Sequence, residues 1–181
     1  MIEFFVREDM LFFVRFFFIL FLLQSDFISA SSNNSSKITK YEGTIMSCHD
    51  GDTCKVQTKD RILKVRLFGI DAPELKQKEG LMAKRYLEKL ILTKTVDLEC
   101  DGKSYDRITC TVFLNEININ EKMAIAGMAL DSPKYSKGIY KLQMLKAKSD
   151  KLGIWKTLDR SPKCFRHKNK FACQTNPMEM N

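Results

Sequence analysis

The sequence feature that most constrains this chain is a short alternating run that leads into a turn, residues 65–74 (Val-Arg-Leu-Phe-Gly-Ile-Asp-Ala-Pro-Glu). Val65 and Leu67 are spaced two apart, which is the period of a β-strand with one buried face. Arg66 lies between them and is therefore expected on the opposite face. The pattern predicts a strand that buries apolar residues on one side and presents one guanidinium group to a groove on the other.

The turn after this strand carries two carboxylates. Gly69 permits a bend, and Pro73 fixes its own φ and restricts the residue before it, so Asp71 and Glu74 lie on a stiff loop. Carboxylate oxygens suit hard divalent cations, and a guanidinium matches a phosphate in a bidentate manner. The segment therefore predicts a site for a metal and a phosphodiester. An ordinary surface ion pair between Arg66 and one of the acids is the alternative interpretation.

The N-terminus has the pattern of a secretory leader. An unbroken apolar run over residues 16–23 follows Arg15 and precedes the small-residue pattern Ile-Ser-Ala at residues 28–30. The run is too short to span a bilayer as a helix. We expect residues 1–30 to be a signal peptide, with translation starting at Met10, and the product to be secreted or periplasmic. An uncleaved membrane anchor is the alternative.

The remaining chain is strongly basic. Residues 1–30 contain two basic and four acidic side chains, so their removal changes the formal charge from +8 to +10. This balance favours polyanionic partners such as nucleic acid or an anionic membrane. The length suits one domain with appendages. We predict a disordered polar linker at 31–38, a folded domain at 39–158 and a basic, cysteine-containing tail at 159–181.

Six cysteines in an exported chain imply a disulfide framework, and six allow fifteen connectivities. Pairing between near neighbours is the simplest expectation: Cys48 with Cys54, Cys100 with Cys110, and Cys164 with Cys173. Two alternatives stay open. Cys54 is also suited to be a small buried apolar residue, and Cys164, His167 and Cys173 are candidate ligands for zinc, although their spacing is irregular.

The apolar periodicity predicts five strands and three helices. The strands are expected at 39–48, 54–58, 62–68, 95–100 and 108–114, and the helices at 80–92, at a short segment capped by Asn118 or Asn120, and at 137–151. A long helix between the third and fourth strands is the arrangement of the OB fold. The predicted fold class is α+β, mainly β: a five-stranded OB barrel with three helices. SH3-like barrels also have five strands but lack that helix.

Four short motifs resemble the staphylococcal nuclease (thermonuclease) family in order, spacing and residue type. They are Asp-Gly-Asp-Thr at 50–53, the run at 65–74, Tyr-Asp-Arg at 105–107 and Gly-Ile-Trp at 153–155. The resemblance covers about residues 40–155. It implies an OB barrel with three helices and a calcium-dependent phosphodiesterase that cuts both DNA and RNA.

The resemblance also implies a calcium site. Asp52 and Asp71 correspond to the carboxylate ligands, and the backbone carbonyl of Ala72 corresponds to a third ligand. Asp50 corresponds to an acid in the outer shell of the ion. Ca²⁺ is therefore the expected cofactor.

The catalytic and nucleotide-binding roles follow from the same resemblance. Glu74 corresponds to the residue that orients and deprotonates the attacking water, and Arg66 and Arg107 correspond to the pair that grips the scissile phosphate. Tyr105 and Tyr135 are expected to flank the nucleotide. Two arginines suit a phosphoryl transition state because their forked donors face its oxygens in pairs.

Three positions depart from the family pattern. Asp106 stands where the family has glycine, Lys103 where an acid is usual, and Pro133 where the best-known member has an aromatic residue. We expect a monomer that acts on DNA and RNA and has no stable membrane association once the leader is removed. The alternative functions are a non-catalytic OB-fold module that binds nucleic acid through charge, and a basic protein attached to anionic membranes.

Overall fold

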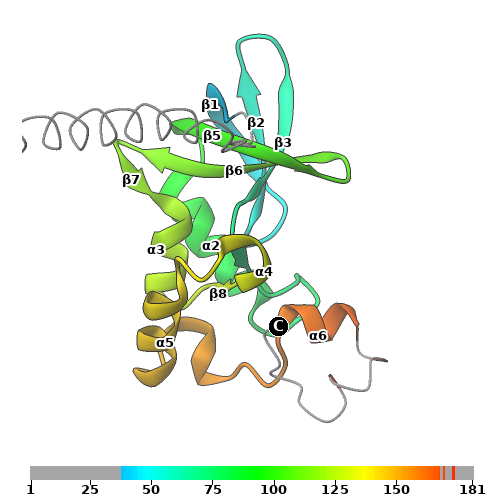
Figure 1. Ribbon diagram of the computed structural model, residues 1–181, viewed down its shortest axis with the longest axis vertical. Helices are drawn as coiled ribbons and strands as arrows, with labels where there is room; N and C mark the ends of the chain where they lie inside the picture. The colour runs from blue at the N-terminus through cyan, green and yellow to red at the C-terminus, as the bar shows by residue number, and fades with distance from the viewer. Residues whose placement is uncertain (1–37, 168, 170–172, 174–181) are drawn as a thin grey trace, which may run out of the picture. The chain divides into compact units, whose positions relative to one another are not determined.

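The computed structural model describes residues 38–167, 169 and 173, and its central feature is a closed five-stranded β-barrel (Figure 1). The first three strands form an antiparallel meander, the third pairs in parallel with the fifth, and the fourth closes the circle against the first. The predicted OB-type barrel of the α+β class is confirmed. Its strands are β1 (Thr39–Cys48), β2 (Thr53–Thr58), β3 (Ile62–Leu67), β5 (Thr95–Ser104) and β6 (Arg107–Leu114).

Three very short strands lie outside this circle. β7 (Ile117–Asn118) extends the sheet beyond β6, and β4 (Ile70–Asp71) pairs with β8 (Leu130–Asp131). β4 continues directly from the strand that carries Arg66, and its pairing places Asp71 opposite Leu130. The acidic turn is therefore held at both ends by backbone hydrogen bonds, as its predicted stiffness requires.

The three expected helices are present as α2 (Gly80–Ile91), α3 (Ile119–Ile125) and α5 (Lys141–Ser149). Asn118 caps α3 by accepting a hydrogen bond from the backbone N–H of Glu121. The helix expected at 137–151 begins later because Lys137 takes a left-handed conformation, with φ 56°, and ends a separate short helix. The short helices are α4 (Pro133–Ser136), η2 (Gly153–Lys156) and α6 (Pro162–Arg166).

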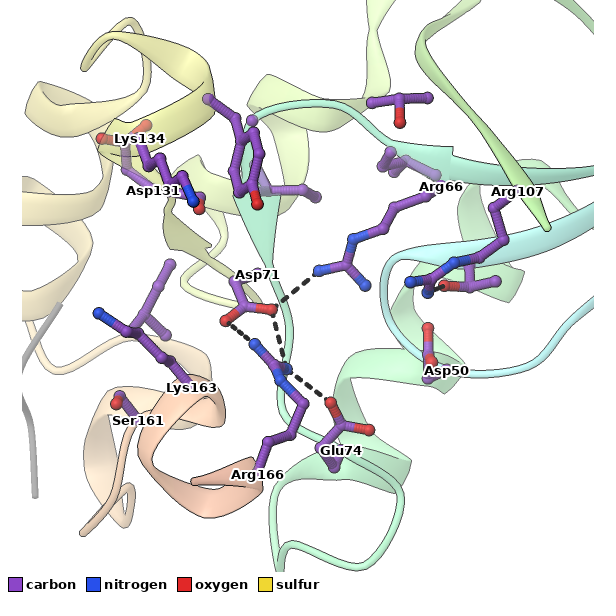
Figure 2. Close-up of a pocket in the computed structure, with 18 of the residues that line it drawn as sticks. Asp50, Arg66, Asp71, Glu74, Arg107, Asp131, Lys134, Ser161, Lys163 and Arg166 are labelled. Carbon is purple, nitrogen blue, oxygen red and sulfur yellow. Dashed lines mark hydrogen bonds and ion pairs between the residues drawn. The ribbon is translucent and has the colours of Figure 1, made fainter. Parts of the chain in front are cut away.

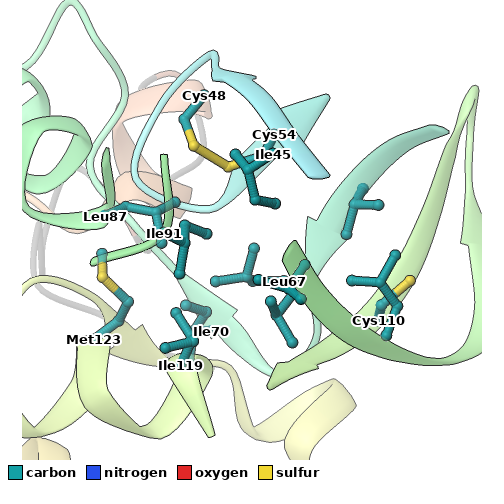
Figure 3. Close-up of a cluster of buried hydrophobic side chains, with 14 of the residues drawn as sticks. Ile45, Cys48, Cys54, Leu67, Ile70, Leu87, Ile91, Cys110, Ile119 and Met123 are labelled. Atoms are coloured by element: carbon teal, nitrogen blue, oxygen red, sulfur yellow. A yellow bond between two sulfur atoms is a disulfide. The ribbon is translucent and has the colours of Figure 1, made fainter. Parts of the chain in front are cut away.

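The core lies inside the barrel and between the barrel and α2 (Figure 3). Ile45, Val65 and Leu67 point inward from their strands, and Leu87 and Ile91 cover the barrel from the apolar face of α2. Each such buried side chain stabilises the fold by about 1.5–3 kcal/mol. This core fixes which face of β3 is turned outward, and that face carries Arg66.

The β5–β6 hairpin is longer than the sequence indicated. Residues 101–107 were expected to form a loop, but β5 continues to Ser104, which pairs with Arg107 across a tight turn. The pairing register between β5 and β6 shifts between Cys100 and Gly102, and the two strands stay paired on both sides of this shift. Residues 101–103 are all exposed, so this part of the strand has no buried face. Its sequence therefore lacks the apolar–polar alternation from which a strand is predicted.

All three expected disulfides are present: Cys48–Cys54, Cys100–Cys110 and Cys164–Cys173. The first two join opposed residues of neighbouring strands, whereas the third lies in the tail. Because Cys164 and Cys173 are bonded to each other, the zinc alternative is wrong. The predicted signal peptide (1–30) and residues 31–37 of the linker lie outside the described residues. None of the helices within the described part combines the length and apolar character needed to cross a membrane.

Candidate active site

A cavity of about 790 Å³ opens beside β3, between the β5–β6 turn, α4 and α6. Figure 2 shows the acidic turn at its centre, with Arg66 and Arg107 on one side and Arg166 on the other. Both predicted arginines therefore lie on the same flank of the barrel as the acids. The expected site residues that line the cavity are Asp50, Arg66, Asp71, Glu74, Tyr105, Arg107 and Tyr135.

Arg66 bridges two carboxylates. Its Nη1 donates to Oδ1 of Asp52 at 2.6 Å, and its Nη2 donates to Oδ1 of Asp71 at 2.9 Å. The side chain is only 19 % exposed, and the Asp52 side chain is 2 % exposed. Burial lowers the pKa of Arg66, but the charges of Asp52 and Asp71 outweigh burial and raise it. One guanidinium is thus shared by two acids in a poorly solvated place.

Asp52 lies beneath this guanidinium. Its carboxylate also accepts hydrogen bonds from the Thr53 hydroxyl at 3.0 Å and from the Ala72 N–H at 2.9 Å. The pKa of Asp52 is raised to about 6. Burial is the main cause and the Asp50 charge adds to it, whereas the Arg66 charge opposes both. Asp50 itself is buried and accepts from the Asp52 N–H at 3.0 Å. The carboxylate is therefore held at a fixed place and takes up a proton more readily than an exposed one.

The expected metal ligands lie close together, and Arg66 bridges the two carboxylates among them, Asp52 and Asp71. Asp52 and Ala72 are buried in the wall behind it and do not line the cavity, whereas Asp71 does. In the part of the chain that the structure describes, no three His, Cys, Asp or Glu side chains converge as a complete metal cage. An ion at this position would take two carboxylates and complete its shell with backbone and water oxygens, which Ca²⁺ accepts readily.

A close approach of the backbone packs the Asp50–Asp52 turn against its neighbours. A Cβ added at Gly51 would lie 2.7 Å from the Cβ of Ala72 and 2.8 Å from that of Ala83. Only glycine leaves room for the turn to contact both the acidic segment and α2. Packing alone therefore accounts for the glycine of the motif at residues 50–53.

Arg107 stands at the start of β6 with little to hold it. Its Nη1 reaches the Thr53 hydroxyl at a long 3.4 Å, and it forms no ion pair with a carboxylate of the described residues. The side chain is half-buried and lines the cavity. Arg107 is therefore a cation whose charge no described carboxylate balances, in contrast to Arg66.

Glu74 is held by the turn that follows it. Its N–H donates to Oε1 of Gln77 at 3.0 Å, and its carbonyl accepts from the Gln77 N–H at 2.8 Å. The Gln77 side chain also donates to the carbonyl of Arg160, which ties the turn to the segment before α6. The Glu74 carboxylate, with its side chain one third exposed, faces the cavity beside Asp71.

Arg166 was missed by the sequence reasoning. It projects from α6 and donates to Oε1 of Glu74 at 2.6 Å, to Oδ2 of Asp71 at 2.8 Å and to Oδ1 of Asp71 at 3.1 Å (Figure 2). Burial lowers its pKa, and the hydrogen bonds and charges of Asp71 and Glu74 outweigh burial and raise it. Because 92 positions separate Arg166 from Glu74, no local pattern links the two residues. The one signal in the sequence was a basic residue close to a cysteine that was expected to form a disulfide.

The aspartate that replaces the family's glycine is accommodated. Tyr105, not Asp106, takes the left-handed conformation, with φ 59°. Asp106 accepts a hydrogen bond from Lys64 at 2.8 Å, and this bond lowers its pKa. Tyr105 is 96 % exposed and Tyr135 is 59 % exposed, and both line the cavity. The two rings are therefore accessible to a ligand that enters the cavity.

Comparison with known proteins places this site in context. Residues 64–157 match a family described as staphylococcal nuclease homologue. An "Uncharacterized endonuclease" of Haemophilus influenzae is 37 % identical over 114 residues, which are 61 % of this chain and 64 % of that protein. A protein of the same description from Escherichia coli is 30 % identical over 123 residues, which are 66 % of this chain and 80 % of that protein.

Proposed function

The chain belongs to the staphylococcal nuclease family, and on that basis we propose that it is a nuclease that hydrolyses phosphodiester bonds of DNA and RNA. The observation that carries the proposal is the convergence of Arg66, Arg107 and Glu74 on one cavity next to Asp71. Attack on a phosphodiester builds negative charge on the phosphoryl oxygens. Two guanidinium groups can stabilise this charge, and one carboxylate can act as the general base for the attacking water.

Arg66 and Arg107 are assigned to the scissile phosphate. Arg107 has no ion pair with a described carboxylate, whereas Arg66 is oriented by Asp52 and Asp71 and also lines the cavity. A forked, permanently charged group that is already held in place loses little freedom when the phosphate binds. The two residues are therefore expected to stabilise the transition state more than the bound substrate.

Glu74 is assigned to the attacking water. The turn through Gln77 fixes its backbone, and its carboxylate faces the cavity. A general base must lie within hydrogen-bond reach of the water that it deprotonates. Arg166 donates to Oε1 of Glu74, so this oxygen is fully available to the water only when Arg166 has left it.

Asp52, Asp71 and the Ala72 carbonyl are assigned to Ca²⁺. They are oxygen donors, and a single side chain, Arg66, already reaches both carboxylates, so the two acids are close enough to share one cation. When bound, the ion would supply positive charge beside the phosphate and a site for water. The Asp50 carboxylate orients Asp52 by accepting a hydrogen bond from the Asp52 backbone N–H. The proposal includes secretion of a monomer after removal of residues 1–30, without membrane attachment.

A non-catalytic OB-fold module that binds nucleic acid through charge is the competing function. It would explain the basic balance, but it gives no role to a Glu74 carboxylate that faces the cavity beside two arginines. Incubation of the purified chain with plasmid DNA and with RNA, in calcium and in a chelator, separates the two. We expect calcium-dependent cleavage that Glu74→Gln slows by about 100-fold or more. Binding without cleavage in calcium would favour the module.

A further inference from the structure

The tail of the chain closes on the candidate active site. Arg166 lies nine residues beyond position 157, where the family match ends, yet it makes three hydrogen bonds to Asp71 and Glu74. These are the residues to which the proposed function assigns the ion and the water. A segment outside the matched region therefore occupies the carboxylates on which the reaction depends.

A guanidinium and a divalent ion compete for these oxygens. Oδ1 of Asp71 accepts from both Arg66 and Arg166, and Oδ2 accepts from Arg166. An ion that binds this carboxylate must share its oxygens with these donors, and adjacent cations repel each other. The ion therefore binds more weakly while both guanidinium groups remain on Asp71.

Arg166 is better placed to leave than Arg66. The Arg66 side chain is 19 % exposed and is also bonded to the buried Asp52, whereas the Arg166 side chain is 36 % exposed. Arg166 ends a helix of five residues, so its side chain can turn to water while the barrel stays unchanged. Release of Arg66 would instead break its hydrogen bonds to both Asp52 and Asp71, and the Asp52 side chain is only 2 % exposed.

We propose that Arg166 is a positioning residue that holds Asp71 and Glu74 in the metal-free protein and competes with the divalent ion for them. The C-terminal segment then sets the calcium affinity of the site. This inference rests on the proposed function, since it takes Asp71 as a calcium ligand. It adds a residue that the family match does not contain.

The segment is anchored so that the competitor is always present. The hydrogen bond from Gln77 to the Arg160 carbonyl ties the start of this segment to the turn at Glu74, and the Cys164–Cys173 disulfide closes a loop within the segment. A tethered competitor acts at a high effective concentration. If Arg166 is closed on Asp71 about 90 % of the time, the apparent affinity for the ion falls about tenfold, because only the open fraction binds it.

The test is a calorimetric titration of Ca²⁺ into the purified, chelator-stripped chain without nucleic acid. We expect Arg166→Ala to lower the Kd for calcium about tenfold. Lys163→Ala is the matched control: it removes the same charge from the same helix and cavity wall, and Lys163 makes no ion pair with a carboxylate of the described residues. The control should change the Kd by less than about twofold. Arg166→Gln, which keeps most of the side chain, should resemble Arg166→Ala and guards against a folding defect.

The outcomes separate this inference from the proposed function. If the unaltered chain binds calcium, Asp71→Asn weakens binding, and Arg166→Ala leaves the Kd unchanged or raises it, the competition is wrong while the calcium site stands. Equal gains from Arg166→Ala and Lys163→Ala would also overturn it, because they would indicate a general effect of charge. If neither the unaltered chain nor Arg166→Ala binds calcium, the calcium site and the competition are both wrong.

Discussion

Replacement of Arg66 by alanine should destabilise the metal-free protein far more than the same change at Arg107. Arg66 is the cation shared by Asp52 and Asp71, whose side chains are 2 % and 12 % exposed. Removal of one partner of a buried ion pair costs about 3–5 kcal/mol. The lower end of that range is expected here, since Asp52 can take up a proton once its cation is gone. Arg107 loses only one long hydrogen bond to Thr53, which is worth about 1 kcal/mol or less.

Urea unfolding at pH 7 in a chelator measures this difference. With a slope of about 2 kcal/mol per molar urea, the Arg66→Ala midpoint should fall by about 1.5 M and the Arg107→Ala midpoint by less than about 0.5 M. Arg66→Lys should lie between them, because a lysine keeps the charge but cannot donate to both acids with separate nitrogens. Added calcium should restore much of the loss in Arg66→Ala, since an ion can replace the missing cation between Asp52 and Asp71.

Two results would refute this reasoning. A midpoint of Arg66→Ala close to that of the unaltered chain would show that the bridge contributes nothing to stability. Equal losses in Arg66→Ala and Arg107→Ala would show that the two arginines do not differ in how they are held. Both variants should be checked for folded structure by circular dichroism before unfolding.

Three further predictions concern catalysis and pH. Glu74→Gln should lower kcat by about 100-fold or more while the Kd for an uncleaved oligonucleotide changes little, and equal losses in rate and affinity would indicate a structural role. Arg66→Lys should be nearly as inactive as Arg66→Ala in initial-rate assays, and a lysine variant that keeps most of the activity would contradict the phosphate clamp. In a chelator, the unfolding free energy should rise by about 2 kcal/mol as pH falls from 7 to 4, because native Asp52, with its pKa raised to about 6, binds a proton that the unfolded chain, near 3.8, largely does not. Asp52→Asn should lack this rise in denaturant titrations across the same pH range, and a rise of the same size in that variant would rule out Asp52 as its source.

Much of the fold was predictable because its signals are local. The alternation in residues 62–68, the turn chemistry of residues 50–53 and the Asn118 cap each depend on near neighbours, and the structure has β3, the β1–β2 turn and α3 where they were expected. The hairpin extension to Ser104 was not predictable in this way, since a strand exposed on both faces has no apolar period.

The sequence by itself determined which side chains could form a site: the acids of the β1–β2 turn and of the turn after β3, and the arginines of β3 and of the start of β6. Only the tertiary structure decided how they share charge. Arg66 lies between Asp52 and Asp71, Arg107 is left unpaired by any described carboxylate, and Arg166 returns from the tail to the acids. The physical reason is that local patterns act over a few residues. Partners that are 14, 54 or 95 positions apart meet only because the closure of the barrel and the return of the tail bring them together, and no short-range pattern in the chain encodes these contacts.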